Sequence, residues 1–172
     1  METNKRHKNV ASLSEMKSFE SSNGRFSVTA KNLSIAAGAK ELGCNWFELP
    51  QGKTSFPYHY HTGIEEAIYI LKGKGTARIG KDNVEVKEGD FLSFPAGPNN
   101  AHTLINTGTE PMQYLCFSNH SHVDIMGYPD SKKIGFYATP DPAEWPQKSA
   151  WVRMMIKDQP NIDYFEGENK DE

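Results

Sequence analysis

The sequence predicts an all-β fold in which many short strands form a barrel or sandwich. Turn-forming Gly and Pro residues recur at short intervals between Gly38 and Pro111. The segments between them are rich in β-branched and aromatic residues, which favour strands. No segment between residues 40 and 120 combines a helical spacing of apolar residues with helix caps. Short strands joined by regular turns are typical of sandwiches and barrels.

Each expected strand lies between two of these turns. The strands are expected at residues 45–49, 66–71, 76–79, 84–86, 91–94, 103–105 and 112–117. Several of these segments are apolar over three or four consecutive residues. Such runs are typical of strands that are covered on both faces.

The chain is expected to hold one domain with additions at both ends. Residues 1–22 are polar and predict a flexible N-terminal arm, and residues 23–122 predict the barrel. Residues 123–165 are rich in turns, with possible strands at 134–139 and 152–156, and predict an extension packed on the barrel. Residues 166–172 predict a solvated acidic tail.

Composition excludes several classes of protein. The formal net charge is −3 and the basic residues are spread along the chain, which argues against a nucleic-acid partner. No apolar run reaches the roughly 18 residues of a membrane span, so no membrane association is expected. No apolar segment follows the charged N-terminus, and Cys44 and Cys116 predict two buried or semi-buried thiols in a reducing compartment. A cytoplasmic location is therefore expected.

Three histidines and a glutamate form the candidate metal site. His59 and His61 are two residues apart, so on a strand both imidazoles project from one face. Glu66 opens the next expected strand after a short reversal, and His102 precedes the strand at 103–105. A mixed nitrogen and oxygen ligand set suits one divalent ion of Zn, Mn, Fe, Ni or Co and disfavours Ca.

The spacing of these residues resembles the cupin family. The stretches that carry the resemblance are His59-x-His61-x4-Glu66-x6-Gly73 and Gly89-x5-Pro95-x-Gly97-x4-His102-x3-Asn106. They are similar to the first and second cupin motifs and cover roughly residues 40–118. Two departures stand out. Gly52 lies seven rather than six residues before His59, and the second motif has two residues more than usual between Gly97 and His102, which lengthens a loop at the pocket rim.

The resemblance implies a double-stranded β-helix, or jelly-roll barrel, with short terminal extensions and a metal ion inside. It also implies the ligands His59, His61, Glu66 and His102. Glu65 competes for the carboxylate position, because a straight strand would place it in phase with His61. Residues 101–106 and 128–131 further resemble small single-domain bacterial cupins, some of which carry the name of sugar-phosphate isomerases.

Other residues have weaker claims to a role. Four aromatic residues are candidates to line a substrate pocket around the metal: Phe56, Tyr69, Phe94 and Phe117. The candidates for a general base are Tyr69, Glu65 and His120. His120 and His122 form a second pair spaced like the first, for which simple solvation competes with a proton shuttle or a second site.

Three functions follow from such a site. The first is a metal-dependent isomerase or epimerase that moves a proton on a sugar or another small polar substrate. The second is an Fe(II)-dependent dioxygenase. The third is a sensor or binding module that does not turn its ligand over. An enzyme of the first class leads, and the resemblance also implies a homodimer formed through sheet faces and through residues 1–35 and 123–165.

Overall fold

The computed structural model describes residues 7–143, 148–157 and 159–168, and nearly all of the regular structure is β. The strands are β1 (Phe19–Asn23), β2 (Phe26–Asn32), β3 (Leu42–Leu49), β4 (Tyr60–His61), β5 (Glu66–Lys72), β6 (Lys74–Ile79), β7 (Asp82–Lys87), β8 (Phe91–Phe94), β9 (His102–Ile105), β10 (Met112–Asn119), β11 (Val123–Tyr128), β12 (Lys133–Ala138) and β13 (Val152–Lys157). The short helices are α1 (Leu33–Ala36) and the 3-10 turns η1 (Leu13–Glu15), η2 (Pro98–Asn100) and η3 (Pro129–Ser131).

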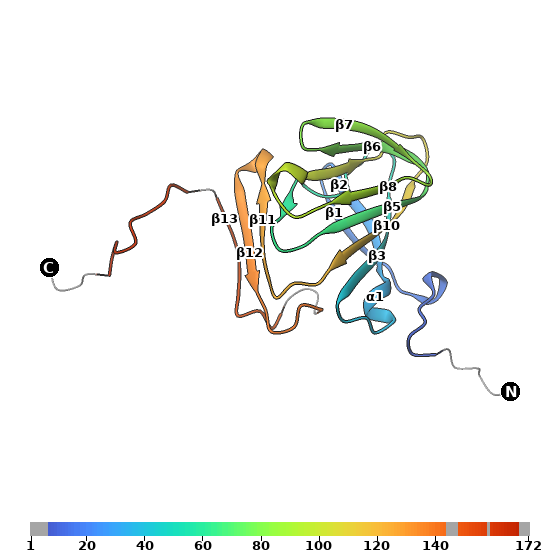
Figure 1. The fold of residues 1–172 in the computed structure, drawn as a ribbon. Coiled ribbons are helices and arrows are strands. Elements are labelled where there is room, and N and C mark those ends of the chain that lie inside the picture. Colours follow the sequence, from blue (N-terminus) through green and yellow to red (C-terminus); the bar gives the residue numbers. More distant parts are fainter. Residues whose placement is uncertain (1–6, 144–147, 158, 169–172) are drawn as a thin grey trace.

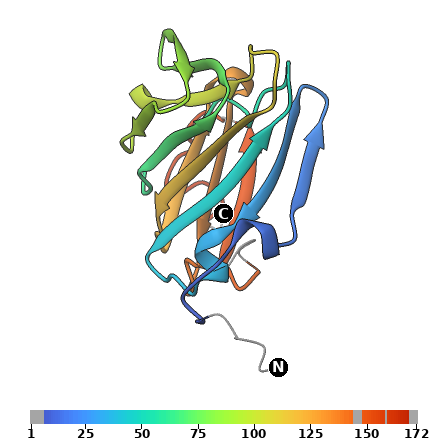
Figure 2. The same cartoon turned by 90° about the vertical axis from the view of Figure 1, so that its right-hand side faces the viewer.

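The largest sheet has six strands in the order β1-β2-β3-β10-β5-β8, and every neighbouring pair is antiparallel. Figure 2 shows β2, β3 and β10 running side by side across this sheet. Because β10 lies between β3 and β5, residues far apart in the sequence meet on one sheet face. Ser118, for example, is opposite Gly43 on one side and Glu66 on the other.

Two smaller sheets complete the jelly roll. Their orders are β13-β12-β11-β4 and β7-β6-β9. Figure 1 shows β11, β12 and β13 as a layer on one side of the molecule and the six-stranded sheet on the other. The jelly roll is confirmed, but the strands do not close into one continuous hydrogen-bonded barrel. Isolated bridges at Thr54 and between His59 and His102 join the sheets instead.

The core lies on the inner face of the six-stranded sheet and follows the two-residue period of its strands. On β5, Ile68 and Ile70 point inward in phase with Glu66, whereas Ala67 and Tyr69 point outward. Phe47 of β3 stacks on Tyr114 of β10, with 5.2 Å between the ring centroids. Full burial of each such side chain contributes about 1.5 to 3 kcal/mol. This packing supports the strand that carries Glu66.

The terminal segments differ from their predicted roles. Strand β1, which overlaps the end of the predicted arm at residues 19–22, pairs with β2 along its whole length. Its composition is polar because its side chains are exposed, while its backbone still completes a sheet. The predicted extension supplies β11, β12 and β13, and β11 pairs with β4, which carries His61. Residues 1–6, 144–147, 158 and 169–172 of the predicted arm, extension and tail lie outside the described residues.

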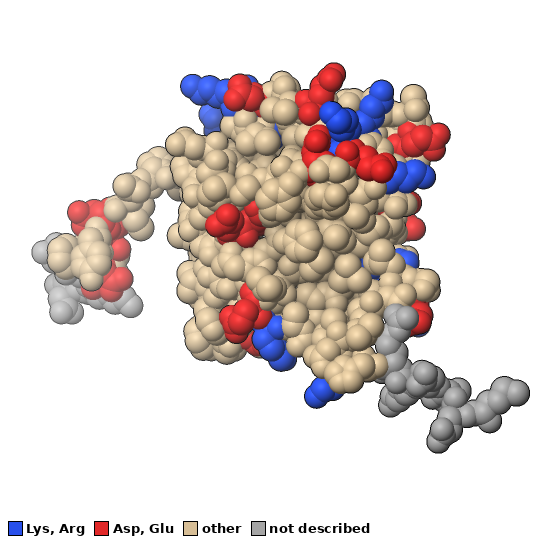
Figure 3. Space-filling model, turned by 45° about the vertical axis from the view of Figure 1, so that its right-hand side comes forward, with Lys and Arg blue, Asp and Glu red and all other residues tan. Residues whose placement is uncertain are grey.

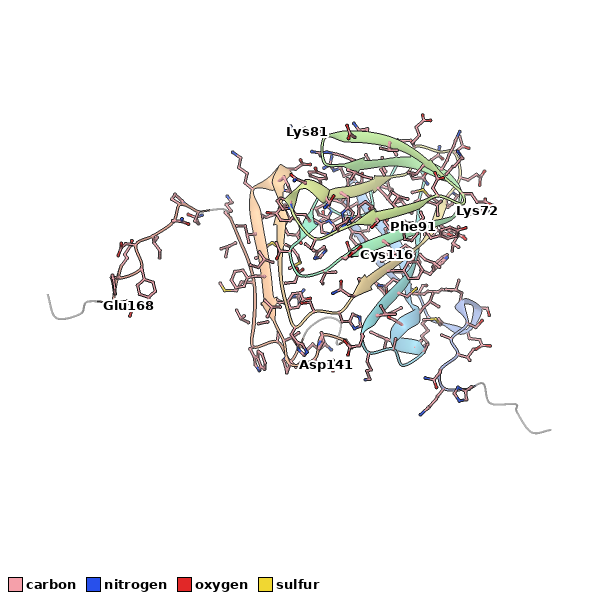
Figure 4. All side chains as sticks on the ribbon, viewed as in Figure 1. Lys72, Lys81, Phe91, Cys116, Asp141 and Glu168 are labelled. Carbon is pink, nitrogen blue, oxygen red and sulfur yellow. The ribbon has the colours of Figure 1, made fainter. Side chains whose placement is uncertain are left out.

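The C-terminal segment runs away from the sheets beyond β13, and Figure 4 labels Glu168 near its described end. The described residues 166–168 are exposed. In the described part of the chain, no helix is both long enough and apolar enough to cross a membrane.

Candidate metal centre

The two chain segments that carry the histidines lie against each other. The backbone N–H of His59 donates to the carbonyl of His102 at 3.2 Å, and the N–H of His102 donates back to His59 at 2.8 Å. The two rings lie inward, 5.0 Å apart between centroids, and His61 lies 5.0 Å from His59 on its other side. The extended backbone therefore brings all three imidazoles to one place.

Glu66 completes the cluster. Its Oε2 lies 3.9 Å from Nε2 of His59, 3.5 Å from Nε2 of His61 and 3.2 Å from Nε2 of His102. The ligand atoms of His59, His61 and Glu66 all lie within 4.8 Å of one another. Glu65 does not compete: it is exposed, because the inward phase of β5 belongs to its first residue, Glu66.

Each imidazole is oriented by an acceptor behind it. Nδ1–H of His59 donates to the carbonyl of Pro57 at 2.8 Å, and Nδ1–H of His102 donates to the carbonyl of Asn100 at 3.0 Å. Nδ1–H of His61 donates to the carboxylate of Asp124. Because each Nδ1 carries the proton, each Nε2 presents a lone pair toward Glu66. Metal-binding histidines are held in this way, so the donor set fits a divalent cation.

The charges of the cluster suit a cation as well. Burial lowers the pKa of His59 to about 4, although the nearby charge of Glu66 opposes the shift. Burial alone would raise the pKa of Glu66, but its interactions with His102 and with the neighbouring imidazoles of His61 and His59 hold it at about 2. At neutral pH His59 is therefore neutral and Glu66 is ionised. These are the protonation states that a metal ligand requires.

Asp124 is the main site residue that sequence reasoning missed. It lies on β11, is 1% exposed and accepts from His61 and from the backbone N–H groups of Thr62 and Gly63 at 3.2 and 2.9 Å. Burial tends to lower the pKa of His61, but the bond to Asp124 and the charge of Glu66 outweigh it and raise that pKa. The only sequence signal was an acidic residue inside the β-prone run at 123–128.

The longer loop of the second motif supports His102. Pro98–Asn100 forms η2, and Nδ2 of Asn100 donates to the carbonyl of Pro95 at 2.9 Å. The carbonyl of Asn100 then receives the His102 proton. The extra residues thus form a closed turn that holds the third imidazole.

A cavity of about 710 Å³ opens beside the cluster and is lined by His59, His61, Glu66 and His102. Its volume lies within the range of small-molecule sites. Of the predicted pocket residues, Phe56 lines the cavity. Phe94 is buried behind His102 and stacks on its ring at 3.6 Å.

The predictions for Tyr69 and Phe117 were wrong. The two side chains are 39% and 37% exposed on the outer face of the six-stranded sheet, because both occupy the outward phase of their strands. Tyr128 was missed as a pocket residue: it lines the cavity and stacks on His59 at 5.9 Å.

The three candidates for a general base also differ in whether they line the cavity. Glu65 and Tyr69 are exposed and do not line the cavity. His120 does line it. His122 is exposed outside it, with Nδ1 bonded to the carbonyl of Thr139 at 2.9 Å.

Fold and site together define a jelly-roll protein with an internal cluster of three histidines and one carboxylate beside a small-molecule cavity. Residues 45–118 match the family described as "Cupin domain". Residues 45–118 of the chain therefore form a cupin domain.

Individual relatives extend this likeness over more of the chain. A "Putative sugar phosphate isomerase" of Acidithiobacillus ferrooxidans is 27% identical, with a TM-score of 0.75 over 91% of this chain and 97% of that one. A "sugar phosphate isomerase from a cupin superfamily" of Silicibacter pomeroyi is 19% identical, with a TM-score of 0.71 over 85% and 90%, and shows the fold alone.

A curated relative is the "Uncharacterized protein" of Methanocaldococcus jannaschii, 38% identical over 68 residues. The match covers 38% of this chain and 53% of that protein, so the chain spans about half the length of this relative.

Proposed function

We propose that this protein is a metal-dependent enzyme that holds one divalent ion with His59, His61, Glu66 and His102 and isomerises a small polar substrate by proton transfer. The observation that carries the proposal is the orientation of the three imidazoles, whose Nε2 atoms face one ionised carboxylate at 3.2 to 3.9 Å. The Nδ1–H of each imidazole is already hydrogen-bonded, so only the Nε2 atoms and the Glu66 carboxylate remain to bind an ion.

The ion, when bound, supplies a Lewis acid that polarises a carbonyl or hydroxyl oxygen. The residues of the chain do the remaining work. Asp124 and the carbonyls of Pro57 and Asn100 keep the histidines in the required tautomer. Tyr128 and Phe56 form walls of the cavity and keep water away from the bound molecule.

Two findings support an isomerase over the other classes. The 27% identical relative named for sugar phosphate isomerisation matches over 91% of this chain. The cavity also combines apolar walls with hydroxyl, amide and imidazole groups, among them Asn45, Ser118 and His120. Such a lining suits a polyhydroxylated molecule with a short carbon chain.

The test loads the purified protein with Mn, Zn, Co, Ni or Fe(II) and incubates it in D2O with ribose 5-phosphate, glucose 6-phosphate and fructose 6-phosphate. We expect proton NMR to show deuterium replacing the hydrogen beside the carbonyl and aldose converting to ketose. Metal-stripped protein should show neither, because no Lewis acid then polarises the carbonyl.

The other outcomes discriminate among functions. Dioxygen uptake by the Fe(II) form without isotope exchange would show a dioxygenase. A protein that lacks affinity for Zn, Mn and Fe would show a binding module that does not turn its ligand over. Either result would contradict the isomerase proposal.

We further propose that two copies of the chain associate through the outer face of the six-stranded sheet, in a cytoplasmic setting that suits the free thiols of Cys44 and Cys116. Phe91, labelled in Figure 4, is 64% exposed opposite Tyr69, and Phe117 extends this apolar surface. Figure 3 shows charged groups mostly toward the top of the molecule, with a broad area below that carries few. Exposed apolar surfaces of this kind mark interfaces.

We expect the wild-type protein to sediment as a dimer in analytical ultracentrifugation and Phe91→Asp to shift it toward monomer, because a buried unpaired charge is costly at an interface. Val84→Asp, on exposed β7 of another sheet, is the control and should remain dimeric. A strictly monomeric wild-type protein would refute the association.

A further inference from the structure

Two further polar residues, Ser118 and His120, line the same cavity beside the ligand set. Glu66, Ser118 and Gly43 form a row on the inner face of three neighbouring strands, β5, β10 and β3. Directly opposed residues in a sheet have Cβ positions roughly 4.5 to 5.5 Å apart. Ser118 is therefore the nearest inner-face neighbour of Glu66 on β10, and His120 follows it two residues later.

Hydrogen bonds to the backbone hold His120 in place through its Nδ1 and its backbone N–H. Its Nδ1–H donates to the carbonyl of Lys40 at 2.6 Å, and its backbone N–H donates to the carbonyl of Glu41 at 2.9 Å. Because Nδ1 carries the proton, Nε2 is left as an acceptor. Within the described residues, no group of the chain donates to it.

Gly43 makes room for this acceptor. A Cβ at that position would lie 3.2 Å from Nε2 of His120 and too close to Oγ of Ser118 for either to stay in place. The imidazole nitrogen and the hydroxyl thus share the space that a side chain would fill. Both residues line the cavity, and Oγ of Ser118 has no hydrogen-bond partner in the described part of the chain.

Other titratable groups along the cavity are less suited to take a proton. Glu66 belongs to the ligand cluster and its pKa is held at about 2. Burial raises the pKa of Tyr137 to about 12, and its hydroxyl already donates to the carbonyl of Ser121. Among the described lining residues, His120 is the one imidazole outside the ligand set.

We propose that His120 is the catalytic base and acid of the isomerisation, and that Ser118 holds the substrate between His120 and the ligand cluster. This inference rests on the proposed function. It sets the substrate class as an α-hydroxycarbonyl compound, whose C–H beside the carbonyl is acidic enough for an imidazole to remove.

The step balances without another reactant. Nε2 of His120 takes the proton from the hydroxyl-bearing carbon, the C–H electron pair forms a C=C bond, and the carbonyl oxygen takes the displaced pair. The hydroxyl proton then moves to that oxygen, for which the Ser118 hydroxyl, both donor and acceptor, is placed to act as relay. Finally His120 returns its proton to the former carbonyl carbon, which gives the isomeric carbonyl compound.

His120→Ala tests the assignment, with His122→Ala as the matched control because His122 is the same residue type two positions away and outside the cavity. We expect His120→Ala to keep its full metal content and lose roughly 100- to 10,000-fold in the deuterium exchange rate, the usual contribution of a general base. Added imidazole should restore part of the rate. His122→Ala should stay within about twofold of wild type.

A second readout does not depend on turnover. In protein with 15N-labelled histidine, ribose 5-phosphate should shift the Nε2 resonance of His120 and leave that of His122 unchanged. Should His120→Ala fail to fold, His120→Gln keeps a polar side chain of similar reach and serves in its place.

The outcomes separate the two proposals. Exchange at the wild-type rate in His120→Ala, or a loss of exchange that only follows a loss of metal, overturns the role of His120 while the isomerase stands. An Nε2 resonance of His120 that does not shift when the sugar phosphate is added also overturns the role of His120. If the wild-type protein catalyses deuterium exchange in none of the three sugar phosphates, both the proposed function and this inference are overturned.

Discussion

His59→Ala should abolish tight metal binding while the protein remains folded. The substitution removes one of four inward donors, and the loss should exceed the roughly 10- to 100-fold that removal of an outer-shell partner costs. The fold should survive because the bonds that join His59 to His102 run between backbone atoms, which alanine retains. Isothermal titration with Zn or Mn, with circular dichroism for the fold, measures both effects.

His102→Ala gives an independent check on the ligand set. This ring also stacks on Phe94 at 3.6 Å, so some stability should be lost along with the metal. His122→Ala is the control for both variants, because its ring is exposed and outside the cavity. Full metal occupancy in both His59→Ala and His102→Ala would show that the ligand assignment is wrong.

Asp124→Ala should have the largest effect on stability. It leaves the N–H groups of His61, Thr62 and Gly63 without their shared acceptor in a buried setting. We expect the free energy of unfolding to fall by about 3 kcal/mol. For a chain of this size the melting temperature should drop by roughly 6 to 12 °C. Thermal and urea unfolding of the metal-free protein measure this effect.

Asp124→Asn separates the two roles of this residue. The amide oxygen can still accept from Thr62 and Gly63, so most of the stability should remain. The amide nitrogen is a donor, however, and opposite it His61 would have to carry its proton on Nε2. That tautomer offers no lone pair to a metal, so affinity should fall by roughly 10- to 100-fold or more.

The control for Asp124 is Asp130→Asn, which removes an exposed carboxylate paired with Arg78 at 2.7 Å. Exposed pairs contribute about 0 to 1 kcal/mol, so stability and metal affinity should barely change. Equal effects of the substitutions at Asp124 and Asp130 would contradict the role given to Asp124.

The sequence indicated the β class, most strands of the core and the meeting of the four candidate ligands. Turn residues and the alternation of apolar positions are local signals, so they can be read from short segments of the sequence. The strands expected at 134–139 and 152–156 are present as Lys133–Ala138 and Val152–Lys157. The predicted arm was wrong at residues 19–22, which belong to β1, because pairing through the backbone needs no apolar side chains.

The inward or outward phase of each strand needed the structure. Sequence reasoning placed Tyr69 and Phe117 in the pocket because both are aromatic and close to the motifs. A shift of one residue moves a strand side chain to the other face, and nothing in the local composition marks which face is inside. The same uncertainty left Glu65 as a rival of Glu66 until β5 was seen to begin at Glu66.

The sequence by itself therefore determined the family motifs, the fold class and the candidate ligands, since each depends on fixed spacing within short segments. Only the tertiary structure showed which residues hydrogen-bond to those ligands and which line the cavity beside them. Asp124 reaches His61 across 63 positions of the chain, and His120 reaches the cavity past Gly43, a glycine on another strand. Such partners are set by which strands lie side by side, and sheet pairing over long distances leaves no periodic trace in the sequence.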